Sequence, residues 1–208
     1  MSYKRRKSHS LRNTLIAIVV VVMALVSLIE VGNLINQGKP STPSTSNPTA
    51  PDGAKILLIT NIGNITIQLY NDMPITSRNF LNLTEHGIYD GTLFSRVAPG
   101  FVIQGGDATP KGIVVPPIPD ELPNKHSNVQ GSVAMAKTSQ PNSATSQFFI
   151  NLANNSASLD SNYVVFGQVI AGWDTVIKIS QVPITPVLSQ NDGKPIQNIT
   201  IVRAIVVG

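Results

Sequence analysis

The chain has 208 residues, no cysteine and a formal net charge of +4. This length accommodates one ordinary domain with an extension, and the absence of cysteine excludes a disulfide framework, thiolate metal ligands and a cysteine nucleophile. Five of the fifteen basic residues lie within residues 4–12, so ten basic residues face eleven acidic ones in the rest of the chain. That near-neutral body lacks the basic footprint of a nucleic-acid-binding protein.

The first part of the chain has the pattern of a membrane anchor. Residues 15–29 form an apolar run broken only by Ser27, and a basic cluster precedes it. A helix needs ~20 mostly apolar residues to span a bilayer, with a lower limit of ~17, and residues 14–31 reach this limit if Glu30 extends to the interface. We therefore expect a basic cytoplasmic segment over residues 1–13 and a transmembrane anchor over residues 14–31. Because basic residues stay on the cytoplasmic side, the rest of the chain should lie on the extracytoplasmic side.

A cleaved signal peptide is the alternative interpretation, because its charged start and apolar centre look the same. A small-x-small cleavage site should then follow the apolar run. Ala24 lies inside the run, and Gly32 has Glu30 two positions before it, so neither makes a good site. The sequence favours an uncleaved anchor over a cleaved signal, and the flanking residues argue against a buried core helix.

Residues 39–52, KPSTPSTSNPTAPD, contain no apolar residues that could build a core. Their prolines, serines and threonines are typical of an extended linker. We assign residues 32–53 to the linker and residues 54–208 to one folded domain.

The folded domain begins with a predicted hairpin. Residues 55–60 form a strand-like apolar run, residues 61–64 have turn chemistry, and residues 65–69 alternate between apolar and polar side chains. An amphipathic helix should follow over residues 77–86, and a second short helix over residues 172–180. Further strands are expected over residues 93–98, 101–104, 132–137, 147–152, 164–169 and 199–207. Many short strands with only two helices predict a mainly β domain, a closed antiparallel barrel.

Three stretches carry the resemblance to a known family. They are residues 94–107 (FSRVAPGFVIQGGD), residues 131–137 (GSVAMAK) leading into 143–151 (SATSQFFIN), and residues 159–160 (LD) followed by 163–169 (YVVFGQV). In this order and spacing they resemble the cyclophilins, especially the shorter bacterial-type members. The resemblance extends from about residue 55 to residue 207, nearly the whole folded domain.

The resemblance implies an eight-stranded antiparallel barrel capped by two helices, with a proline-binding groove on its outer face and peptidyl-prolyl cis/trans isomerase activity. Arg96 matches the family's catalytic arginine, and Gln104 matches a glutamine that orients the substrate and the arginine. The substrate-binding positions are matched by Phe101, Val102, Phe149 and Leu159 in the proline pocket, Ala136 and Lys137 at the backbone rim, and Tyr163 where many members have histidine. The implied partners are proline-containing segments of proteins.

The chemistry of this reaction explains why so few functional groups are needed. Rotation about an X–Pro bond meets a barrier of ~18–20 kcal/mol, but no covalent bond is broken. We therefore expect no metal, cofactor or nucleophile. An apolar pocket for the proline ring and a fixed, permanently charged donor such as arginine are sufficient.

The sequence departs from the family at two positions near the expected site. Ser95 replaces the histidine that usually precedes the arginine, and Ser158 stands where relatives carry tryptophan or phenylalanine. These departures keep open a second hypothesis, a peptide-binding module or chaperone with little catalysis. A third hypothesis, a purely structural barrel, is less favoured because the chain ends straight after the last strand. The carboxylates of Asp120 and Glu121 are interpreted as surface groups.

Overall fold

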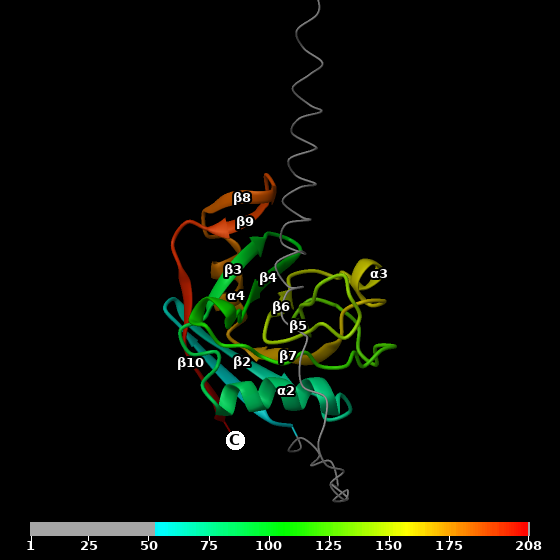
Figure 1. Cartoon of the computed structure of the whole chain (residues 1–208). Helices are drawn as coiled ribbons and strands as arrows, with labels where there is room; N and C mark the ends of the chain where they lie inside the picture. Colours follow the sequence, from blue (N-terminus) through cyan, green and yellow to red (C-terminus); the bar gives the residue numbers. More distant parts are fainter. Residues whose placement is uncertain (1–52, 208) are drawn as a thin grey trace, which may run out of the picture. The chain divides into compact units, whose positions relative to one another are not determined.

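The structure is a computed structural model that describes residues 53–207 (Figure 1). The predicted anchor over residues 14–31 and nearly all of the predicted linker lie outside the described residues. Within residues 53–207, no helix is both long enough and apolar enough to cross a membrane.

Eight antiparallel strands form a ring, which confirms the predicted barrel. The pairing of β10 with β3 closes the ring. In spatial order the strands are β10 (Ile199–Val207), β1 (Lys55–Thr60), β2 (Gly63–Leu69), β7 (Val165–Ala171), β5 (Ser132–Met135), β6 (Phe148–Asn151), β4 (Val102–Gly105) and β3 (Leu93–Ala98).

The interior of the barrel is filled by alternate residues of these strands, as the two-residue period of a β-strand requires. Ile56 and Leu58 on β1 are fully buried, and so are Ile65 and Ile67 on β2. Phe80 lies at the centre of an aromatic cluster, with ring centroids 4.8–5.2 Å from those of its neighbours Tyr89, Phe148 and Phe166.

Two longer helices pack on the barrel close to their predicted positions. Helix α2 (Pro74–Glu85) packs against β7 and β10, and α4 (Trp173–Ser180) packs against β2, β3 and β4. Helix α2 begins earlier than predicted because Pro74 occupies its first turn, where a missing N–H costs nothing. A four-residue helix α3 (Ser156–Leu159) and a 3-10 turn η1 (Thr109–Lys111) were not predicted.

A loop carboxylate caps the start of α2. The side chain of Glu121 accepts hydrogen bonds from the backbone N–H groups of Ile75 and Thr76 over 3.0 and 2.7 Å. These N–H groups have no partner within the helix, and the positive end of the helix favours a negative charge. The interpretation of Glu121 as a surface group was therefore wrong, since it joins the proline-rich loop to α2.

An additional hairpin extends the sheet beyond the barrel. Strands β8 (Ile184–Ser189) and β9 (Asp192–Pro195) pair with each other, and β9 joins β3 through Val97 and Gly193. Figure 1 shows this hairpin in orange, beside β3. It was not predicted from the sequence.

Candidate functional site

A β-bulge sets the direction of the Arg96 side chain. Phe94 lies opposite Gly105 and Arg96 lies opposite Gln104, so Ser95 is an extra residue on β3. Phe94 and Val97 are both buried in the barrel core although they are three residues apart. The bulge allows both Phe94 and Val97 to face the core, and it turns Arg96 to the outer face.

The strand register places the predicted residues in one row across the outer face of the sheet. Arg96 pairs with Gln104, Gln104 with Phe149, Phe149 with Ala134, and Ala134 with Val165. Directly opposed residues have their side chains about 4.5–5.5 Å apart. A charged group, an amide and an apolar surface therefore follow one another across neighbouring strands.

Next to this row is a pocket of about 420 Å³. Its apolar side is formed by a cluster of buried residues that is separate from the barrel core. This cluster includes Val102, Phe149 and Leu159. The structure brings together around this pocket all nine residues predicted for the site, together with Leu188. The nine are Arg96, Phe101, Val102, Gln104, Ala136, Lys137, Phe149, Leu159 and Tyr163.

The pocket has aromatic walls in defined orientations. The Tyr163 ring meets the Phe149 ring edge to face at a centroid distance of 5.6 Å, which is a favoured geometry for two aromatic rings. The Arg96 guanidinium carbon lies 6.0 Å from the centroid of the Phe101 ring. Asn155 holds the loop that carries Phe101, because its side-chain amide donates to the Phe101 carbonyl over 2.9 Å.

The Arg96 guanidinium is held by two side chains. Its Nε and Nη2 donate to the two carboxylate oxygens of Asp192 over 2.8 and 2.6 Å, and its Nη1 donates to Gln104 Oε1 over 3.3 Å. The hydrogen bonds to Asp192 raise the pKa of the Arg96 guanidinium above its ordinary value, although partial burial opposes this. Arg96 is therefore a permanent cation at the edge of an apolar pocket.

Lys137 is also held in place at this site. Its ammonium group lies 2.6 Å from an Asp120 carboxylate oxygen, and the two side chains are only 10% and 11% exposed. Asp120 accepts a further hydrogen bond from the backbone N–H of Asn142. Asp120 was interpreted as a surface residue, and this was wrong, because it is the partner of a residue that lines the pocket.

The sequence-based prediction missed three residues of this site. Asp192 and Leu188 come from the unpredicted hairpin, and Gln147 accepts a hydrogen bond from the Gln104 amide over 2.9 Å. The local signal for a turn was Asp192-Gly193, a dipeptide typical of tight hairpins, although in the structure it directly follows the two-residue turn Gln190-Asn191.

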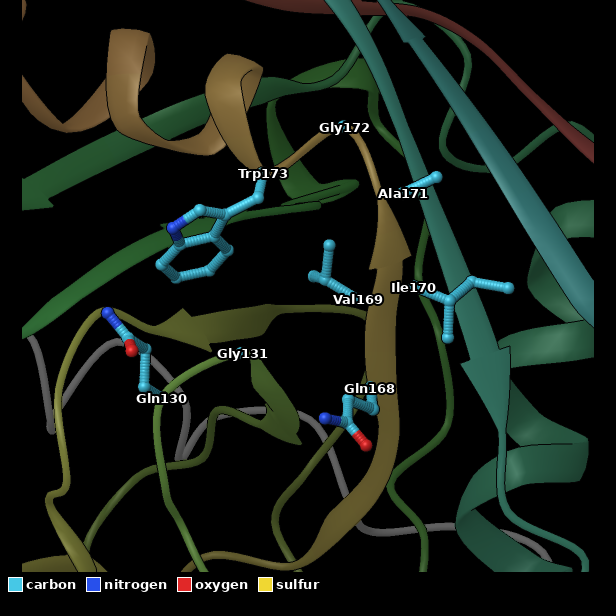
Figure 2. Close-up of a pocket in the computed structure, with 8 residues that line it drawn as sticks. All are labelled: Gln130, Gly131, Gln168, Val169, Ile170, Ala171, Gly172 and Trp173. Atoms are coloured by element: carbon cyan, nitrogen blue, oxygen red, sulfur yellow. The ribbon is translucent and has the colours of Figure 1, made fainter.

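A second hollow of about 350 Å³ lies elsewhere on the domain. Residues 130–131 and 168–173 line it, with Gln130, Val169 and Trp173 around the opening (Figure 2). It contains none of the nine predicted residues and no charged side chain. We therefore place the candidate site at the pocket beside Arg96.

Comparison with protein families identifies the domain. The family described as cyclophilin type peptidyl-prolyl cis-trans isomerase matches residues 55–206. A peptidyl-prolyl cis-trans isomerase of Acinetobacter baylyi is 44% identical over 151 residues, which cover 69% of this chain and 80% of that protein. Peptidyl-prolyl cis-trans isomerase A of Dickeya dadantii is 40% identical over 159 residues, covering 72% of this chain and 80% of the relative.

Solved structures agree with this result. A cyclophilin type peptidyl-prolyl cis-trans isomerase of Cryptosporidium parvum superposes with a TM-score of 0.67 at 30% identity, covering 76% of this chain and 99% of its own. A second structure of that isomerase, determined in the presence of the dipeptide Ala-Pro, has a TM-score of 0.66 at 31% identity, and 74% and 99% of the two chains are covered. The chain belongs to the cyclophilin-type peptidyl-prolyl cis-trans isomerase family, and its folded domain is an enzyme of this class.

Proposed function

We propose that the enzyme holds a proline ring in the apolar pocket and stabilises the twisted imide with a hydrogen bond from Arg96. The observation that carries this proposal is the row of cross-strand neighbours from Arg96 through Gln104 to Phe149, which puts a permanent cation beside the pocket. The related isomerase studied in the presence of Ala-Pro supports a proline-containing ligand.

Arg96 acts on the transition state of rotation. When the X–Pro bond is twisted, the amide resonance is lost and the imide nitrogen regains a lone pair that accepts a hydrogen bond. A hydrogen bond to a charged group contributes roughly 1.5–3 kcal/mol. If this bond forms only in the twisted state, it accelerates rotation by about one to two powers of ten, and binding in the pocket supplies the rest.

The other residues of the pocket bind and orient the peptide. Phe101, Val102, Phe149 and Leu159 surround the proline ring, and Tyr163 extends this wall. The backbone of Ala136 and Lys137 lines the rim along which the peptide lies extended. Gln104 orients both the peptide and the Arg96 guanidinium, to which it is hydrogen bonded.

We further propose that the enzyme works outside the membrane on proline-containing segments of exported or surface proteins. The supporting pattern is the basic cluster, the apolar run over residues 14–31 and the linker that follows. The anchor would hold the enzyme where exported chains emerge and fold. Slow X–Pro exchange, which takes tens to hundreds of seconds without catalysis, would limit their folding there.

The mechanism is tested with residues 52–208 alone. A fragment of this extent is suitable because the Cryptosporidium chain, 99% of which is matched, consists of this domain only. Exchange NMR on an Ala-Pro peptide should show acceleration by the fragment and a loss of about 10- to 100-fold in Arg96→Ala. An unchanged rate in this variant would refute the role of Arg96. Peptide binding without acceleration by the unaltered fragment would favour the binding-module hypothesis and direct attention to Ser95 and Ser158.

The location is tested with the full chain. An uncleaved anchor predicts a full-length product in the membrane fraction, with the C-terminal domain accessible to protease from outside the cell. A shorter product released from the membrane would show that the segment is a cleaved signal. A domain that is protected from external protease in intact cells would contradict the proposed side of the membrane.

A further inference from the structure

The β8–β9 hairpin places one polar side chain against Arg96, at the edge of the pocket. Residues 185–191 of this hairpin are all exposed. The Asp192 side chain, by contrast, is only 15% exposed and lies against Arg96, whose side chain is 30% exposed. An otherwise solvated hairpin therefore delivers a nearly buried carboxylate to the proposed catalytic group.

The contact leaves the end of the guanidinium free for a ligand. Arginine has five N–H donors in a fixed plane. Asp192 occupies the edge formed by Nε and Nη2, and Gln104 accepts from Nη1, so three donors are used by partners within residues 53–207. Two donors remain, one on each terminal nitrogen. Because a bidentate pair fixes the plane of the guanidinium as well as its position, the direction of these two donors is also fixed.

We propose that Asp192 is a positioning residue, which holds the Arg96 guanidinium with its two remaining N–H groups directed at the bound imide. This inference rests on the proposed role of Arg96. Without Asp192, the long arginine side chain would reach its catalytic orientation only part of the time. A misplacement of about 1 Å at a reacting group can cost on the order of 100-fold in rate.

Backbone contacts also hold the hairpin to the barrel. Loss of the Asp192 carboxylate can therefore be tested without unfolding the hairpin. Strand β9 pairs with β3 at Val97 and Gly193. A Cβ atom on Gly193 would lie 2.1 Å from the Thr185 carbonyl oxygen, so glycine is required for the close approach of β8 and β9. These backbone contacts do not involve the Asp192 carboxylate. Asparagine at position 192 should therefore leave the hairpin in place while it removes the charge and one of the two acceptors.

The test compares Asp192→Asn with a matched control in the 52–208 fragment. Asp174→Asn makes the same chemical change at an exposed residue of α4, whose carboxylate lies 3.5 Å from Lys178. The turnover number at saturating Ala-Pro peptide should fall about tenfold in Asp192→Asn, with KM nearly unchanged, and should not change in Asp174→Asn. Asp192→Glu should recover part of the loss because it restores both acceptors.

Two further measurements connect the effect to Arg96. In the Arg96→Ala background, Asp192→Asn should cause no additional loss, because its effect acts through the guanidinium. In NMR spectra, the Arg96 Nε–H proton should exchange with water faster in Asp192→Asn than in the unaltered fragment, while the melting temperature stays the same.

Equal or higher turnover in Asp192→Asn would overturn the inference, since the carboxylate would then be irrelevant or would compete with the substrate. A loss of equal size in the Arg96→Ala background would also overturn it and indicate a structural role. Full activity of Arg96→Ala alone is a different result, because it would refute the proposed function itself.

Discussion

Gln104 lies directly opposite Arg96 across β3 and β4, and its amide connects the guanidinium to a third side chain. Its oxygen accepts from Arg96 Nη1 over 3.3 Å, while its nitrogen donates to Gln147 over 2.9 Å. The amide is therefore oriented by both neighbours. A continuous line of polar groups follows one edge of the apolar pocket.

Replacing Gln104 by leucine should weaken catalysis without unfolding the domain. The substitution removes one hydrogen bond to Arg96 and one to Gln147 in a half-buried position. Because a net hydrogen bond is worth about 0.5–1.5 kcal/mol, kcat/KM should fall roughly two- to tenfold. Gln168→Leu is the control, since Gln168 is exposed and its side chain accepts one hydrogen bond, from the Tyr70 hydroxyl. Equal activity of the two variants would show that Gln104 does not orient Arg96.

The Asp120–Lys137 pair should contribute to stability, because it is nearly buried. Removing one member of such a pair leaves an uncompensated charge, at a cost of about 3–5 kcal/mol. Asp120→Asn should therefore lower the urea midpoint strongly. The double variant Asp120→Asn with Lys137→Met should regain part of this loss, whereas Asp174→Asn at the exposed pair should change little. An Asp120→Asn midpoint equal to that of the unaltered domain would contradict the burial of the pair.

Gly100 and Gly106 both have a left-handed backbone, but only Gly106 is crowded by side chains. Alanine substitutions at the two positions therefore separate the cost of backbone strain from the cost of crowding. At Gly106 φ is +81°, and an added Cβ would lie 2.8 Å from the Phe148 ring. At Gly100 φ is +76°, and apart from its two chain neighbours no part of residues 53–207 lies within 4 Å of the added Cβ. Gly100→Ala should cost about 1–2 kcal/mol from the backbone alone. Gly106→Ala should cost about 1–3 kcal/mol more, because the buried Phe148 ring must move. Urea unfolding measures the loss of stability in each variant. Equal losses in Gly100→Ala and Gly106→Ala would show that crowding at Gly106 has no effect.

Asp160 should make the domain sensitive to acid. Its carboxylate accepts from the Asn128 backbone and side-chain N–H groups over 2.7 and 2.9 Å. Burial raises the pKa of Asp160, but the hydrogen bonds from Asn128 and Ser127 outweigh this and lower it below the ordinary value. A lowered folded-state pKa adds stability above the unfolded-state pKa, and this stability is lost as pH falls through the folded-state pKa.

This effect can be measured as urea midpoints between about pH 6 and pH 2.5. The unaltered domain should lose stability through the acidic part of this range, and Asp160→Asn should lose less because it has no carboxylate to protonate at this position. Parallel curves for the two proteins would show that Asp160 does not contribute to the acid sensitivity.

The eight barrel strands could be predicted because they are short apolar segments between turns, with alternating burial clearest in β1 and β2. The short motifs located the pocket. The β8–β9 hairpin could not be predicted, since its strands contain Pro186 and end at Pro195, and proline removes a backbone donor. The structure tolerates Pro186 because β8 is an edge strand, and Pro195 is the last residue of β9. The Arg96–Asp192 contact joins residues 96 positions apart, and no local pattern reports such a contact. Asp120 and Glu121 were misread for the same reason, since their partners come from other loops and from α2.

The bulge at Ser95 determines which of the following side chains on β3 face the barrel core. Before the bulge, β3 directs Phe94 inward, and after it Val97 points inward, with Arg96 facing out between them. A regular strand that kept Ser95 without the bulge would alternate strictly, so the residues on one side of Ser95 would exchange faces. If Phe94 kept its place in the core, the guanidinium would then point into the barrel and a core valine into water. The bulge thus keeps Phe94 and Val97 in the apolar interior while Arg96 faces the pocket on the outer side.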